Sequence, residues 1–441
     1  MSFLNKNSFL KNVSYLTKLL LALAISSTCA LAQTNVGDGV FYAGSITANT
    51  NMSTPVLFGG AGQGAGGAGS TLYSQPQGYT NTWSATETLK QVVVPVDGTI
   101  SKLYIRQNSS TTTGEYIYTL RLNGAATALT CTCTVGNATC NDTSNSFAVV
   151  AGDVLSLESD PNSSPDLLVG NLYGTVMFSA GEKESLVMGA VNGNITATTT
   201  RYFPIQSVSN GNTTENLASG VIPTGGELSD LYVDLDGDPT AGQYDIELFK
   251  NGAASGLNVT VASGSTTGSN TGTDITVAAG DLVSIEIQQT GGPTVRNLRW
   301  GMRWKPTTNG ESIQVGGAVA LGTSSSTQYI PIADGVSGTA NNTEAARTQL
   351  IQACDVRNLY IGVVTAVGAG NSVAFTARKN AADTTLTATI SGAAQTTNSD
   401  LVNSVTFAAG DRIGMKMVKS AGMPAGDGVH TGVVTYVTPG P

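Results

Sequence analysis

The sequence predicts an all-β fold: three tandem antiparallel β-sandwich domains of the jelly-roll type after a signal peptide. Two observations carry this prediction. Apolar and polar side chains alternate with period two, as in Leu231–Leu235, which is typical of a half-buried strand. Such segments are rich in Val, Ile, Thr and Tyr, are separated by Gly, Asn and Ser turns, and the whole arrangement occurs three times. No helical periodicity longer than two turns follows residue 32.

Residues 1–32 have the three parts of a cleavable signal peptide. A start that contains three lysines precedes the apolar run Leu19–Ile25, and Ala30–Ala32 forms a small-x-small cleavage site. A membrane anchor is the alternative, but the run is much shorter than the about 20 apolar residues that span a bilayer. The sequence therefore predicts a secreted protein, extracellular or on a cell surface, without membrane insertion.

The charge balance restricts the class of partner. Removing residues 1–32 removes three lysines and no acid, which leaves 18 basic and 30 acidic residues and a formal net charge of −12. Nucleic-acid binding needs clustered Lys and Arg, so this balance argues against it. Charged residues make up only 12 % of the chain, so Thr, Ser, Asn and Gly must cover the surface. That composition is common in extracellular and virion structural proteins.

The repeats follow from internal self-similarity. One seven-residue segment recurs at a shift of 128 residues: Thr99–Ile105, Glu227–Val233 and Asp355–Ile361. Each copy opens with an aromatic–proline element and closes with a Gly-led apolar strand. We expect three jelly-roll domains, called the first, second and third repeats below, at residues 33–180, 181–306 and 307–441. The Gly-rich run 59–69 in the first repeat is expected to be a mobile loop.

Two kinds of turn recur at fixed places. Asn-Gly is the preferred two-residue hairpin turn because both residues accept positive φ. Gly-Asp before an apolar strand indicates a second tight turn, in which Asp accepts a backbone N–H. The turn positions are Asn123, Gly124, Gly152, Asp153, Asn251, Gly252, Gly280, Asp281, Gly410 and Asp411. A catalytic role for these aspartates is disfavoured because each stands alone at a turn.

These motifs resemble the jelly-roll globular heads of the tumour necrosis factor and complement-q superfamily. The resemblance rests on Leu120–Gly124 with Val149–Leu157, and on Leu248–Gly252 with Val277–Ile285. Two features depart from the family: no Gly-X-Y stalk precedes the domains, and one chain carries three heads. Because that family works as trimers, the resemblance implies an intramolecular pseudo-trimer, with a linear array as the alternative. Similar units occur in bacterial surface and phage structural proteins.

Four cysteines follow the signal peptide, and secretion permits disulfides. A two-residue turn at Gly136–Asn137 would place Cys133 opposite Cys140, so we predict a Cys133–Cys140 bridge. A Cys131–Cys140 bridge is the alternative. Cys354 stands where the other repeats have glycine, which indicates a small core residue.

Calcium is the one cofactor that the sequence suggests. Asp234, Asp236 and Asp238 place carboxylates at alternate positions, which suits Ca²⁺. However, Pro239 stands where such a loop needs Gly, and the other repeats carry no matching acids. An exposed acidic loop is therefore the alternative.

Catalysis finds little support, because the chain has one histidine and no Gly-x-Ser-x-Gly motif. We expect no enzyme, but a secreted structural or adhesive protein of a cell surface or extracellular matrix. It would act through contacts with other proteins or with copies of itself. The alternatives are a carbohydrate-binding β-sandwich array that recognises glycans and a phage-derived virion or fibre component. Trp83, Trp300 and Trp304 do not stand at equivalent positions, which weakens a repeated stacking platform for sugars.

Overall fold

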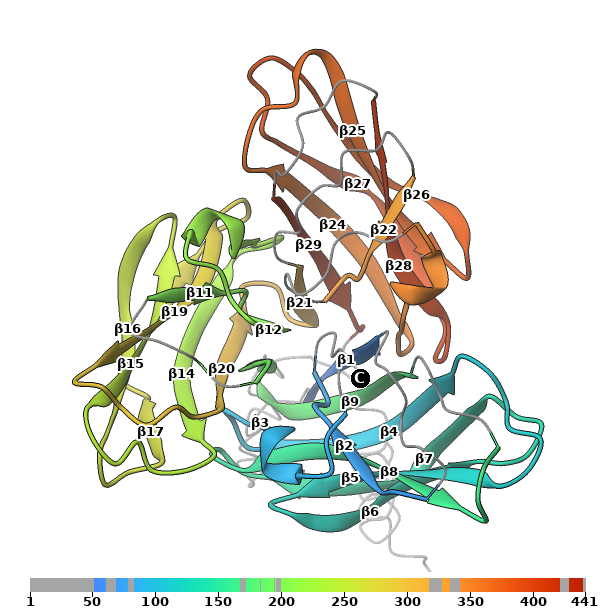
Figure 1. Cartoon of the computed structure of the whole chain (residues 1–441). Coiled ribbons are helices and arrows are strands. Elements are labelled where there is room, and N and C mark those ends of the chain that lie inside the picture. Colours follow the sequence, from blue (N-terminus) through green and yellow to red (C-terminus); the bar gives the residue numbers. More distant parts are fainter. Residues whose placement is uncertain are drawn as a thin grey trace, which may run out of the picture. The chain divides into compact units, whose positions relative to one another are not determined.

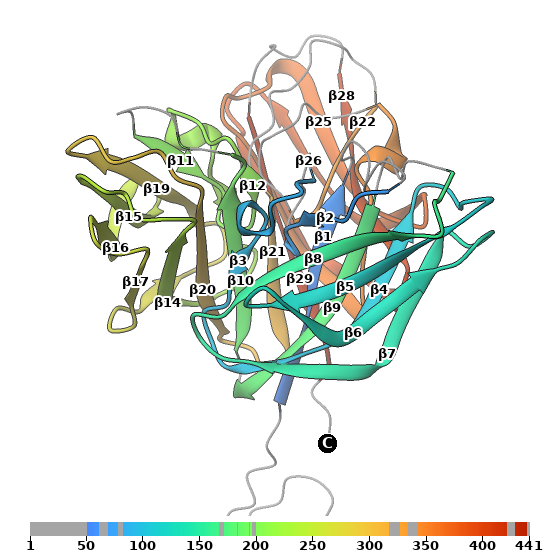
Figure 2. The same ribbon diagram turned by 60° about the horizontal axis from the view of Figure 1, so that its bottom comes forward.

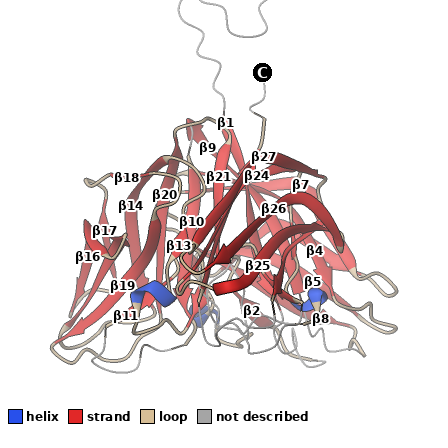
Figure 3. Ribbon diagram, turned by 90° about the horizontal axis from the view of Figure 1, so that it is seen from above, coloured by secondary structure: helices blue, strands red, loops and turns tan. Residues whose placement is uncertain are grey.

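A computed structural model gives the fold (Figure 1). It describes residues 51–60, 69–77, 83–166, 172–182, 184–193, 195, 200–316, 327–333, 342–420 and 428–438. The predicted signal peptide 1–32 and most of the Gly-rich run 59–69 lie outside these residues. The described chain is all-β, and its helices are single 3₁₀ turns, drawn blue in Figure 3: η1 (Glu87–Leu89), η2 (Glu215–Leu217) and η3 (Glu344–Ala346). No described helix is long and apolar enough to cross a membrane.

The first repeat forms two sheets, drawn blue to green in Figure 1. The first has the order β1 (Asn51–Gly60), β9 (Leu172–Glu182), β4 (Gly98–Gln107) and β7 (Thr139–Val149). The second has the order β2 (Leu72–Ser74), β8 (Val154–Asn162), β5 (Glu115–Leu122) and β6 (Ala125–Cys133), and β3 (Val92–Val93) also pairs with β8.

The second repeat has the same plan, in green to yellow. Its first sheet runs β12 (Val208–Ser209), β10 (Ser185–Val191), β20 (Leu298–Pro306), β14 (Gly226–Leu235) and β17 (Thr267–Asn270), with β18 (Ile275–Val277) also on β14. Its second sheet runs β11 (Arg201–Phe203), β19 (Leu282–Thr290), β15 (Gln243–Lys250) and β16 (Ala253–Ala262), with β13 (Gly220–Val221) also on β19. Among the described strand pairs of this repeat, only the short β10–β12 pair is parallel.

The third repeat, in orange to red, repeats the plan once more. Its first sheet runs β21 (Glu311–Gly316), β29 (Val429–Tyr436), β24 (Cys354–Val363) and β27 (Thr397–Phe407). Its second sheet runs β22 (Gln328–Ile330), β28 (Arg412–Lys419), β25 (Gly368–Lys379) and β26 (Ala382–Gly392), with β23 (Gln349–Leu350) also on β28. In each repeat, one sheet thus contains the first strand, the last strand and the strand that carries the recurrent seven-residue segment.

The predicted strand alternation is present, with a bulge in the middle. In β14 the residues Leu231, Val233 and Leu235 are buried and Tyr232 is half-buried, as period two requires. Upstream of Leu231 the pairing register with β20 shifts, and Asp230 takes φ of 49°. A β-bulge of this kind increases the local twist of its strand. Equivalent bulges occur in β4 and β24.

Buried apolar side chains gather in three clusters among the described residues, one for each repeat. The first strand of a repeat also enters the cluster of the preceding repeat. Leu186 and Met188 of β10 pack in the first repeat's cluster, and Ile313 and Val315 of β21 pack in the second repeat's. The cycle closes through Leu57 of β1, which packs in the third repeat's cluster.

Each core therefore depends on a strand from the next repeat, and Met52–Thr438 form one compact unit. Figure 2 shows the strands involved: β1, β10 and β21 lie where the coloured sheet pairs meet. The core of each repeat includes side chains of a strand from another repeat. The domain boundaries drawn from the sequence therefore stay a prediction.

Candidate functional site: the seams between repeats

The recurrent turns form a hydrogen-bonded clasp within each repeat. Asn123 and Gly124 take φ of 51° and 80°, and they connect β5 to β6. Asn123 Nδ2 donates to Asp153 Oδ1 at 2.7 Å, and Asn123 Oδ1 accepts from Val154 N at 2.9 Å. Asp153 Oδ2 accepts from Val150 N at 2.8 Å. The predicted Asp–backbone bond is present, and the side chain of Asn joins the two turns.

The same clasp recurs in the other repeats. Asn251 Nδ2 donates to Asp281 Oδ1 at 2.8 Å, and Asn380 Nδ2 donates to Asp411 Oδ1 at 2.7 Å. Gly252, Gly280 and Gly410 take φ of 81°, 92° and 84°. These positions have a structural role in the described molecule.

The glycines of the second turn also face the neighbouring repeat. A Cβ built on Gly152 would lie 3.9 Å from Tyr232 Cε1 of the second repeat. A Cβ on Gly280 would lie 3.9 Å from Tyr360 Cε1 of the third, and one on Gly410 would lie 3.6 Å from Tyr104 Cδ1 of the first. We call each of these contact regions between two repeats a seam. The first seam joins the first and second repeats, the second seam joins the second and third, and the third seam joins the third and first. The three seams connect the repeats in a cycle.

The last strand of each repeat adds a second cyclic contact. Arg299 Nη1 of β20 donates to Thr88 O in η1 of the first repeat at 2.7 Å. His430 Nδ1 of β29 lies 2.6 Å from Ser219 O, two residues past η2. The hydroxyl of Tyr173 in β9 donates to the carbonyl of Ala345 in η3. The donor is an arginine, a histidine or a tyrosine, depending on the seam. In each seam, however, the last strand of one repeat contacts a backbone carbonyl in or just after the 3₁₀ turn of another repeat.

Glycine in the last strand allows this close approach. A Cβ on Gly301 would overlap Val93 O of the first repeat, and a Cβ on Gly432 would overlap Val221 O of the second. A side chain there would force the repeats apart. The Gly-led strand is a landmark in the sequence, but its contact with another repeat is seen only in the structure.

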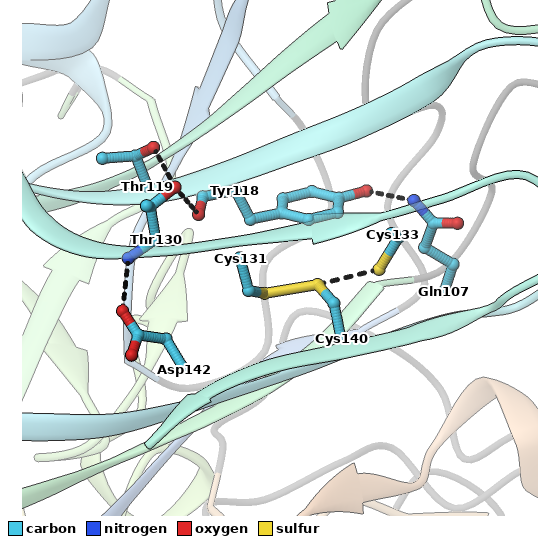
Figure 4. The surroundings of a disulfide bond; sticks show 8 residues. All are labelled: Gln107, Tyr118, Thr119, Thr130, Cys131, Cys133, Cys140 and Asp142. Carbon is cyan, nitrogen blue, oxygen red and sulfur yellow. Dashed lines mark hydrogen bonds between the residues drawn. A yellow bond between two sulfur atoms is a disulfide. The ribbon is translucent and has the colours of Figure 1, made fainter. Parts of the chain in front are cut away.

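The predicted Cys133–Cys140 disulfide is wrong, because Cys140 is bonded to Cys131, the alternative pairing (Figure 4). Cys133 Sγ lies 2.9 Å from Cys140 Sγ as a free thiol, and burial raises its pKa to about 12. Cys354 is a second free, buried thiol at the start of β24.

The error has a geometric cause. Counting outward from Gly136–Asn137 assumed that the flanking strands pair as a hairpin. In the structure β6 pairs with β5 and β7 pairs with β4, so the two strands lie in different sheets of the sandwich. Cys131 and Cys133 are two residues apart and point to the same side, which brings both close to Cys140.

The aspartates of the candidate calcium loop have separate partners. Asp234 forms an ion pair with Arg299. Asp236 Oδ1 accepts from Asn297 N at 3.0 Å, and Asp238 Oδ1 accepts from two backbone amides at 2.7 and 3.0 Å. Within the described ranges no group of three or more His, Cys, Asp or Glu is placed to hold a metal ion. The structure does not bring these three carboxylates together, and the calcium interpretation stays a prediction.

A scan against protein-family models finds no match to the chain, and a search of curated proteins finds none. The antiparallel all-β sheets are compatible with the jelly-roll resemblance drawn from the motifs.

Proposed function

We propose that the chain is a secreted structural or adhesive protein whose three repeats close on one another as an intramolecular pseudo-trimer. The cyclic seams are the observation that carries the proposal. In the resembling family, separate chains supply the three heads, whereas here one chain would supply all of them. Contacts with other proteins would then be made by the outer faces of the assembled unit.

The seam between the third and first repeats is the decisive one, because a linear array has no such contact. Gln352 Nε2 of the third repeat donates to Lys102 O of the first at 2.6 Å. Gln314 Nε2 of β21 donates to Pro55 O of β1 at 3.3 Å. Together with the burial of Leu57 in the third repeat's cluster, these contacts support closure rather than a string of domains.

The placement of aromatic side chains favours this proposal over a sugar-binding array. Trp300 and Trp304 are 0 % exposed in the second repeat's cluster, and Trp83 packs against the first repeat's cluster. A stacking platform for sugars needs exposed aromatic faces, and these rings are used for packing.

Small-angle scattering with light scattering on the mature chain tests the closure. We expect a monomer with the compact radius of gyration of about 20–22 Å that a single globular body of this length has. An elongated particle three domains long would refute the pseudo-trimer. Immunogold labelling of producing cells tests the structural role, which label confined to the medium would contradict.

A further inference from the structure

The third seam carries a charge pattern that the other two seams lack. Arg106 follows the recurrent segment Thr99–Ile105, and the equivalent residues are Asp234 and Gly362. Arg412 follows the Gly-Asp turn of the third repeat, where the other repeats have Val154 and Leu282. Both sides of this seam therefore have an arginine where the other repeats have an acid, a glycine or an apolar residue.

The two arginines lie on opposite sides of the same seam. Arg106 of β4 is in register with Tyr173 of β9, and Tyr173 donates its hydroxyl hydrogen bond to η3 of the third repeat. Arg412 stands two residues after Gly410, which faces Tyr104. Arg106 stands two residues after Tyr104, so Arg106 and Tyr104 share the side of β4 that faces the third repeat.

Neither guanidinium has a hydrogen-bond acceptor or a carboxylate partner among the described residues, although both side chains are half-buried. Burial lowers the pKa of Arg106 from its ordinary value, and the positive charge of Arg412 lowers it further. In the first seam the place of Arg106 is taken by Asp234, which neutralises Arg299. Two like charges on the two sides of a contact oppose its closure unless an anion neutralises them.

We propose that Arg106 and Arg412 form a binding site for a dianionic tetrahedral group, a sulfate or phosphate, at the seam between the third and first repeats. A doubly charged group neutralises both guanidiniums, and each planar guanidinium presents paired N–H donors that match such oxygens. The site would join the two ends of the repeat cycle, so its ligand stabilises the seam that no peptide linker holds.

Isothermal titration calorimetry of the mature protein with sodium sulfate, and separately with inorganic phosphate, tests the site at constant ionic strength. We expect saturable binding of one anion per chain, weakened at least about tenfold in Arg106→Gln and in Arg412→Gln. Lys305→Gln is the control, because Lys305 is an exposed cation of the second repeat, and it should bind as the parent does. The tighter of the two anions shows whether the site prefers a sulfate or a phosphate dianion.

Two results would overturn the proposal: no saturable heat with either anion, or equal affinity in the parent and in Arg106→Gln. Thermal unfolding in chloride checks that the variants fold. Because neither guanidinium has a hydrogen-bond or ion-pair partner in the part of the chain that the structure describes, both variants should melt at or above the parent's temperature. Sulfate stabilises proteins generally by exclusion from their surface, so only the increment lost in the arginine variants and kept in Lys305→Gln counts as site binding.

Discussion

At the turn before β19, Asp281 holds three neighbours at once. Its carboxylate accepts from Ala278 N and Asn251 Nδ2, both at 2.8 Å, and lies 3.0 Å from Lys250 Nζ. Partial burial alone would raise the pKa of Asp281, but these contacts outweigh burial and lower it. The charged form therefore stabilises the fold above the unfolded carboxyl pKa of about 3.9, and this stability is lost as the pH falls through the lower folded pKa.

Asp281→Asn should lower the free energy of unfolding at pH 7 by about 1–3 kcal/mol, because the amide cannot replace a charged acceptor of two N–H groups. The difference from the parent should shrink as the pH falls towards 3. Urea unfolding at pH 7 and pH 3 measures both effects. Asp274→Asn is the control, since that side chain is 61 % exposed. A similar loss in the control would argue against the clasp.

The cysteine pairing gives a second prediction at this scale. Cys133→Ala should keep the Cys131–Cys140 bridge, while Cys131→Ala/Cys133→Ala should unfold about 2–3 kcal/mol more easily than Cys133→Ala, as expected for opening a short loop. The comparison uses the double variant because Cys133 is close enough to replace Cys131. Peptide mapping without reduction, combined with urea unfolding, measures both. A Cys133–Cys140 peptide in the parent would contradict the assignment.

At the scale of elements, the hairpin between β25 and β26 departs from its counterparts. Asn380 and Ala381 take φ of 50° and 67°, the left-handed values that Asn251 and Gly252 adopt in the second repeat. Alanine pays a steric cost there that glycine does not. Ala381→Gly should therefore raise the free energy of unfolding by about 0.5–1 kcal/mol, measured by urea unfolding. Gly252→Ala is the reciprocal control and should destabilise by a similar amount, and a stabilising Gly252→Ala would refute the reasoning.

The strands show how far the sequence could be read. Period-two alternation and the Asn-Gly turns predicted the all-β class, because both depend on neighbouring residues only. The bulges were missed, although the spacing of Ile100, Leu103 and Ile105 contains the slip: two buried residues stand three apart where alternation requires two. Lys102 takes φ of 55° at that point, and lysine gives no turn signal. The disulfide was mispaired because pairing depended on which sheet each strand joins, which local pattern does not specify.

At the scale of the whole molecule, the recurrent landmarks predicted repeats but not what the landmarks contact. Gly301 and Gly432 recur because they let one repeat approach the backbone of another, and that reason is absent from any single repeat. Arg299 and His430 occupy one place with different chemistry, so no shared motif marks the seam. Contacts between distant segments were therefore beyond sequence reasoning, apart from the trimer analogy.

His430 makes the contribution of the second seam to stability depend on pH. Its Nδ1 lies 2.6 Å from Ser219 O, so the neutral ring donates from that nitrogen across the seam. Burial lowers the pKa of His430 below 6.5, and the bond to Ser219 offsets only part of the shift. The neutral ring is therefore the stable form in the folded chain, and the stability it confers is full above pH 6.5 and is lost as the pH falls towards the lower folded pKa.

Because the chain has one histidine, the fall in stability between pH 6.5 and pH 5.5 should belong to His430. We expect a loss approaching about 1.4 kcal/mol per pH unit in urea unfolding, the limit for one proton. His430→Asn keeps an N–H donor without a titrating ring, so its stability should be nearly flat over this interval. Gly362 lies against the histidine ring, and no carboxylate of the described residues is bonded to that ring. A variant that retains the parent's slope would therefore place the titration elsewhere and separate the pH response from the seam.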